Sequence, residues 1–62
     1  MDNHETMMKL KIYESGELVN EYPNEMSWNK ARIIIGKLAR ANGKENISVS
    51  RKDGNIIVNI RK

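Results

Sequence analysis

The sequence predicts an α+β fold in which two β-hairpins flank one helix, in the order ββαββ. Three observations lead to this prediction. Two segments alternate apolar and polar residues around a short turn, and a segment with helical periodicity lies between them. We expect a four-stranded antiparallel sheet with the helix packed on one face, because this assembly buries the apolar faces in only two layers.

The first hairpin is predicted from the alternating segment MKLKIY and the returning segment LVNEY, which are separated by ESGE. A two-residue loop would pair Ile12 with Val19, so that both side chains lie on the core face. The same alternation places Tyr13 and Tyr22 together on the opposite face. We therefore expect two tyrosines on the side of the sheet that the helix does not cover.

The helix is predicted for WNKARIIIGKLARA, residues 28–41. Ser27 is a suitable N-cap, and Asn42-Gly43 would end the helix in a left-handed conformation. At 100° per residue the apolar side chains gather on one broad face, which we expect to cover the sheet. The members of this face are Trp28, Ala31, Ile34, Ile35, Leu38 and Ala39. The opposite face holds Asn29, Lys30, Ile33, Gly36, Lys37 and Arg40.

The second hairpin is predicted from ISVSR and NIIVNIR, which flank Asp53-Gly54, a pair strongly favoured in two-residue type I′ turns. Pairing across this turn directs five aliphatic side chains toward the helix. These are Ile47, Val49, Ile56, Val58 and Ile60. Two strand orders, 2-1-3-4 and 1-2-4-3, make every neighbouring pair antiparallel, and the sequence leaves that choice open.

Size and composition restrict the domain organisation. The 62 residues, 39% of them hydrophobic, suffice for one small domain near the lower size limit for folding without disulfides or metals. Residues 1–7 show no periodicity, so we expect a disordered tail before a single ββαββ domain over residues 8–62. The sequence leaves open whether translation starts at Met1, Met7 or Met8.

Several function classes lack the residues that they need. The chain has no cysteine and one histidine, His4, and no Gly-rich phosphate loop or nucleophile motif. Apolar runs reach only three residues, so we expect no membrane span or signal peptide and a cytoplasmic location. We predict no enzyme activity, no catalytic residue, no metal site and no cofactor.

Charge is distributed unevenly along the chain. Residues 1–29 hold two lysines and six carboxylates, a net charge of −4, whereas residues 30–62 hold nine cations and two carboxylates, a net charge of +7. This asymmetry has two interpretations: a second half that binds a polyanion, or head-to-tail attraction between copies. The totals favour neither.

A basic surface is the first candidate site. Basic helices and sheets with aromatic side chains both bind nucleic acid, by neutralising phosphates and by stacking on bases. The candidate residues are Lys30, Lys37, Arg40, Lys44, Arg51 and Lys52, with Tyr13 and Tyr22 as stacking residues. The alternative is an ordinary solvated surface, because these residue types are common at exposed helix and strand positions.

A protein interface is the second candidate site. Ile33 lies at the centre of the basic helix face, and Gly36 beside it costs helix stability but permits close approach of a partner. Ile57 and Leu18 are expected on the open face of the sheet. The alternative is that these are isolated exposed apolar residues, which are common.

The leading hypothesis is a small non-catalytic regulatory protein that self-associates as a homodimer and binds DNA, RNA or a nucleotide through its basic surface. The second hypothesis is a regulator or inhibitor that binds a protein target through the hydrophobic and basic helix face. Small accessory proteins of phages, prophages and plasmids have this size and organisation. A third hypothesis is a structural subunit of a larger assembly.

Overall fold

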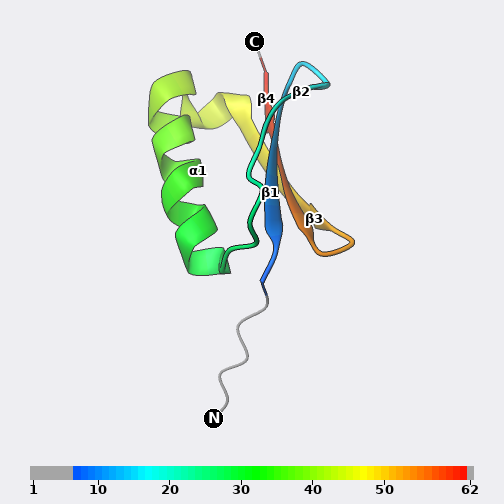
Figure 1. Cartoon of the computed structure of the whole chain (residues 1–62). Coiled ribbons are helices and arrows are strands. Elements are labelled where there is room, and N and C mark those ends of the chain that lie inside the picture. The colour runs from blue at the N-terminus through cyan, green and yellow to red at the C-terminus, as the bar shows by residue number, and fades with distance from the viewer. Residues whose placement is uncertain (1–6, 62) are drawn as a thin grey trace.

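The order of the elements is the predicted ββαββ (Figure 1), which confirms the α+β fold. This computed structural model describes residues 7–61, so the predicted tail falls, apart from Met7, outside the described residues. Met7 is exposed and belongs to no element. The elements are β1 (Lys9–Glu14), β2 (Glu17–Glu21), α1 (Trp28–Asn42), the short 3₁₀ helix η1 (Lys44–Asn46), β3 (Ile47–Lys52) and β4 (Asn55–Ile60).

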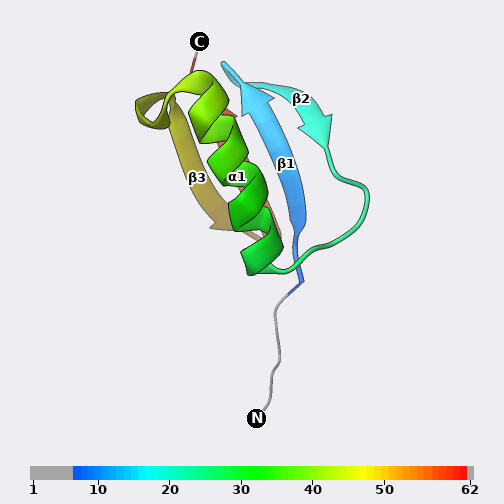
Figure 2. The ribbon, with the colours of Figure 1, turned by 90° about the vertical axis from the view of Figure 1, so that its left-hand side faces the viewer.

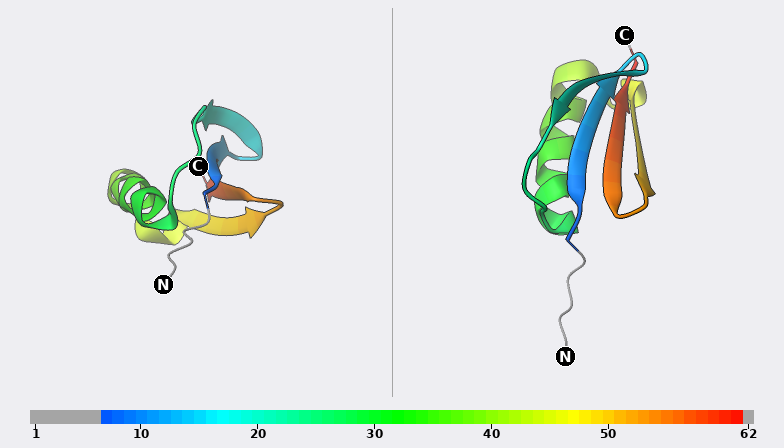
Figure 3. Two further views of the ribbon diagram at one scale, coloured as in Figure 1. Left: turned by 60° about the horizontal axis from the view of Figure 1, so that its bottom comes forward. Right: turned by 45° about the vertical axis from the view of Figure 1, so that its right-hand side comes forward.

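The four strands form one sheet in the order β2-β1-β4-β3, with α1 on one face and no helix or strand of residues 7–61 covering the other (Figure 3). β1 and β4 are parallel, whereas the pairs within each hairpin are antiparallel. The expectation of a wholly antiparallel sheet is therefore wrong for the central pair, and neither expected strand order is found. The observed order puts the two most apolar strands side by side in the centre, where burial by the helix is greatest.

The first hairpin contains a β-bulge that the sequence did not indicate. Tyr13 pairs with Leu18 as expected, but Ile12 pairs with Asn20 and not with Val19. Val19 is therefore the extra residue of the bulge, and 51% of its surface is exposed. Its predicted place in the core is wrong.

The bulge also changes the face on which Tyr22 lies. A one-residue shift moves the following side chains to the other side of a sheet. The Tyr22 amide donates a hydrogen bond to the Leu10 carbonyl at 3.0 Å, and the ring packs against the core. Tyr22 is therefore not beside Tyr13 on the open face, which corrects the predicted pair of tyrosines.

The helix and the second hairpin follow the local signals. The Ser27 side-chain oxygen accepts a hydrogen bond from the Lys30 amide at 3.3 Å, and Gly43, with a φ of 96°, ends the helix. Asp53 and Gly54 both have positive φ, as a type I′ turn requires, and the β3–β4 register is the predicted one. The structure confirms these four predictions.

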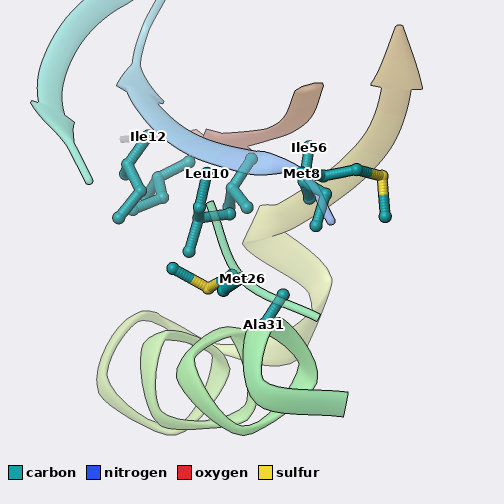
Figure 4. Close-up of a cluster of buried hydrophobic side chains, with 8 residues drawn as sticks. Met8, Leu10, Ile12, Met26, Ala31 and Ile56 are labelled. Carbon is teal, nitrogen blue, oxygen red and sulfur yellow. The ribbon is translucent and has the colours of Figure 1, made fainter. Parts of the chain in front are cut away.

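The core lies between α1 and the two central strands (Figure 4). Leu10, Ile56 and Val58 are fully buried. Met26 is a core residue that the sequence did not reveal: a short bridge joins it to Met8 through backbone hydrogen bonds of 2.8 and 2.9 Å. The buried cluster comprises Met8, Leu10, Ile12, Met26, Ala31, Ile56, Val58 and Ile60.

Within residues 7–61, no helix is long and apolar enough to cross a membrane.

Candidate functional site

The outer face of α1 is the side opposite Ala31, because Ala31 is 0% exposed where the helix meets the sheet. The six residues predicted for the outer face are all exposed, which confirms the assignment of the helix faces. Ile33 is the most exposed large apolar residue described, with 63% of its surface accessible. Exposure of this extent at the centre of a basic face makes this surface a candidate site.

Three cations surround a shallow hollow on this face, which we call the helix hollow. Its volume is about 280 Å³, and Gly36 leaves it open because glycine has no side chain to fill it. No carboxylate is among the described residues that line it, which are Arg32, Ile33, Gly36, Lys37 and Arg40. Arg32 was not a predicted site residue. The sequence feature that could have identified Arg32 is the four-residue spacing Arg32-Gly36-Arg40, because residues four apart are neighbours on one side of a helix.

Lys30 lies apart from the helix hollow. It lines a smaller depression of about 170 Å³ on the β2 side of the helix, together with Tyr22 and Ile34. Its backbone amide is occupied by the Ser27 cap. The structure therefore does not bring Lys30 together with Lys37 and Arg40, although the helical wheel placed them on one broad face.

A second surface, which we call the α1–β3 groove, lies between the helix and the edge strand β3. Its volume is about 500 Å³, and most of its lining side chains are apolar. Arg32 and Gly36 line both this groove and the helix hollow, so the two surfaces are continuous. The lining residues are Trp28, Arg32, Ile35, Gly36, Ala39, Lys44, Ile47 and Val49.

Arg51 lies beside the indole ring of Trp28, which lines the α1–β3 groove. The centre of its guanidinium group lies 5.0 Å from the centroid of the Trp28 ring, in the range of a cation–π contact. Lys44 lines the α1–β3 groove. Lys52 pairs with Asn55 of β4, and Asn55 pairs with Lys9 of β1, so the three side chains lie on the same face of the sheet. Of the predicted basic residues in the second half, Lys44 and Arg51 therefore border the helix surface, and Lys52 lies on the open sheet face.

The open sheet face holds a different set of side chains. Tyr13 lies next to Leu18 and Asn59, and Ile57 lies between Lys11 and Ser50. Tyr13 and Ile57 are half-buried, whereas Leu18 is exposed. Because Tyr22 packs against the core, Tyr13 is the one aromatic side chain that the described residues place on this face.

The predicted interface residues do not form one surface. Leu18 and Ile57 lie on the open sheet face, whereas Ile33 and Gly36 lie on the far side of the helix. Among residues 7–61 there is no group of three His, Cys, Asp or Glu side chains placed to bind a metal ion. The sites that the structure does bring together are the helix hollow and the α1–β3 groove.

Replacing Gly36 with alanine is expected to stabilise the protein by about 1 kcal/mol, because alanine is the better helix former. An added Cβ atom would meet nothing within 4 Å, so no clash opposes this gain. The melting temperature should rise by about 4–8 °C in a thermal scan. Gly43→Ala is the control and should destabilise, because Gly43 has a φ of 96° and a Cβ there would lie 3.0 Å from Asn46 Nδ2. An unchanged or lower melting temperature for Gly36→Ala would contradict the prediction.

Comparison with known proteins finds no matching family model, no match among curated proteins and no matching solved structure.

Proposed function

We propose that this chain is a small non-catalytic binding protein that presents the basic surface of its helix to nucleic acid or a nucleotide. The observation that carries the proposal is the helix hollow, where Arg32, Lys37 and Arg40 surround Gly36 without a carboxylate among them. Phosphates are neutralised by such clustered cations, and the released counterions supply the affinity.

The dimensions of the helix hollow suit a phosphate backbone. Arg32 and Arg40 are eight residues apart, which is about 12 Å along a helix. One strand of DNA carries about three phosphates over that length, at 3.4 Å each. The gap at Gly36 lets a phosphate approach the helix closely, and Lys44 and Arg51 extend the positive charge toward β3.

The sheet contributes less to this proposal than the sequence suggested. Base stacking on a sheet uses several exposed aromatic rings. Tyr13 is half-buried on the open face, and Tyr22 packs against the core. We therefore place binding on the helix side, with phosphate contacts and not base stacking as the main source of affinity.

The test is the salt dependence of binding, measured by fluorescence anisotropy with labelled single-stranded DNA, double-stranded DNA and RNA, and with unlabelled nucleotides as competitors. Three phosphate contacts on duplex DNA predict that the association constant falls roughly 40-fold between about 50 and 200 mM salt. If no DNA, RNA or nucleotide binds at the lower salt concentration, the proposal is wrong. Binding that is indifferent to salt would equally contradict it.

One observation favours a second function, that of a regulator that binds a protein target. Ile33 is 63% exposed within the helix hollow, and the hollow continues into the apolar α1–β3 groove. A phosphate backbone gains little from apolar surface, whereas a protein partner would bury it. Replacement of Ile33 therefore separates the two functions.

A further inference from the structure

The sheet has two free edges with opposite chemistry. Among residues 7–61, β2 and β3 each pair with one neighbouring strand only, and they lie at the two sides of the molecule (Figure 2). An edge strand presents backbone N–H and C=O groups to which another strand can bind. The two edges therefore determine whether, and how, copies of this chain associate through their sheets.

The β2 edge is acidic and exposed along its whole length. All five residues of ELVNE are exposed, and the strand carries two carboxylates and no cation. Leu18 and Val19 expose 45% and 51% of their surfaces. This edge offers two aliphatic side chains between Glu17 and Glu21.

The β3 edge is basic and borders the apolar α1–β3 groove. Arg51 and Lys52 give the strand two cations and no carboxylate, and Lys44 lies at the groove. Val49 is 38% exposed although its side chain lines the groove. This edge therefore offers what the β2 edge lacks, namely positive charge and an apolar recess.

The backbone of β3 is oriented to accept a strand. The Arg61 amide donates a hydrogen bond to the Asn46 carbonyl at 2.8 Å. Because hydrogen-bonded and non-hydrogen-bonded pairs alternate along an antiparallel ladder, every second residue of β3 counted from Asn46 bonds to β4. Ser48, Ser50 and Lys52 continue that set. The N–H and C=O groups of Val49 and Arg51 consequently point away from β4, to the free edge, while their side chains stay on the helix side.

We infer that the β2 edge of one copy binds the β3 edge of a second copy, so that the chain assembles head to tail through a continuous sheet. Pairing β2 with β2 would bring carboxylates together, and pairing β3 with β3 would bring cations together, both at an energetic cost. Only a pairing of β2 with β3 brings two carboxylates, Glu17 and Glu21, to two cations, Arg51 and Lys52.

The strand directions allow this pairing without reorientation. β2 is antiparallel to β1, β3 is antiparallel to β4, and β1 and β4 are parallel, so β2 and β3 run in the same direction. Neighbouring copies therefore meet through a parallel pair, with every helix on the same face. Four strands at about 4.8 Å advance each copy by roughly 19 Å, and their twist turns it by roughly 80–100°. Such a heterologous contact does not close on itself as a dimer and builds an open helical array.

The test is the solution mass of the whole chain, measured by light scattering and sedimentation without nucleic acid, so the result is independent of the proposed function. Micromolar to millimolar protein at low salt should show a mass that rises with concentration to at least twice the 7.2 kDa of one copy. High salt should lower the mass, because the attraction between exposed charges is screened. Amide exchange at Val49 and Arg51 should slow as the protein concentration rises.

Charge exchange makes the test specific. Glu17→Lys with Glu21→Lys makes both edges basic. Lys44→Glu with Lys52→Glu replaces two of the three cations at the β3 edge and makes its net charge negative, although Arg51 remains. Each double variant should be monomeric alone, while an equimolar mixture should assemble again, since unlike edges are then present on different chains. All four positions are exposed, so the variants should fold, which circular dichroism verifies. A wild-type monomer at millimolar concentration, or a dimer that both variants retain, would overturn the inference.

Discussion

Replacing Leu10 with alanine is expected to leave the protein largely unfolded at 25 °C. Leu10 is 0% exposed in the central strand β1, beside Ile56 of the parallel strand β4. A leucine-to-alanine change in a core costs about 2–5 kcal/mol, part of it from the cavity left behind. A domain of this size, without disulfides, has a total stability of only about 3–5 kcal/mol. The loss is therefore comparable with the whole free energy of unfolding.

Urea denaturation followed by circular dichroism measures this loss. Leu18→Ala is the matched control, because it removes the same atoms from a side chain that is 45% exposed on the edge strand β2. We expect its cost to stay near the roughly 0.5 kcal/mol that is usual for surface substitutions. If Leu10→Ala retained the wild-type midpoint, the central position of β1 in the core would be wrong.

Replacing Arg32, Lys37 and Arg40 together with alanine is expected to weaken binding to duplex DNA by on the order of 10³-fold at about 50 mM salt, the counterion-release contribution of three phosphate contacts. The slope of log affinity against log salt should fall by about 2.7. The three side chains are exposed around the helix hollow, so stability should change little. Fluorescence anisotropy across a salt series measures both quantities.

The matched control removes three cations from the other side of the molecule. Lys9, Lys11 and Lys52 lie on the open sheet face, and replacing them with alanine makes the same change in net charge. If binding depends on the helix hollow, this control should lose far less affinity. Equal losses in the two triple variants would indicate attraction by net charge alone and would contradict a site on the helix.

Ile33→Glu distinguishes the second function. For a protein partner, a carboxylate in place of the exposed isoleucine should abolish capture from a nuclease-treated extract, because the apolar contact is lost and a charge is buried. Ile33→Ser should leave affinity for nucleic acid close to the wild-type value. Loss of nucleic-acid binding in the serine variant would mean that the hollow binds through apolar contact as well as charge.

The candidate site could be predicted in part. Helical periodicity alone placed Ile33, Gly36, Lys37 and Arg40 on the exposed face, where the structure has them. It did not identify Arg32, which lies at the margin between the two helix faces. The α1–β3 groove could not be predicted, because it requires β3 to lie at an edge of the sheet, and local spacing contains no information about strand order.

Short-range sequence patterns specify the secondary-structure elements of this protein: the two-residue turns, the Ser27 cap, the helix end at Gly43 and the apolar face of the helix. Each depends on side chains only a few residues apart, so the local sequence contains all the atoms involved. The parallel β1–β4 pair, the bulge at Val19 and the burial of Met26 became evident in the folded molecule alone. These follow from packing between distant segments, where the most apolar strands take the centre of the sheet and the remaining strands become its two oppositely charged edges.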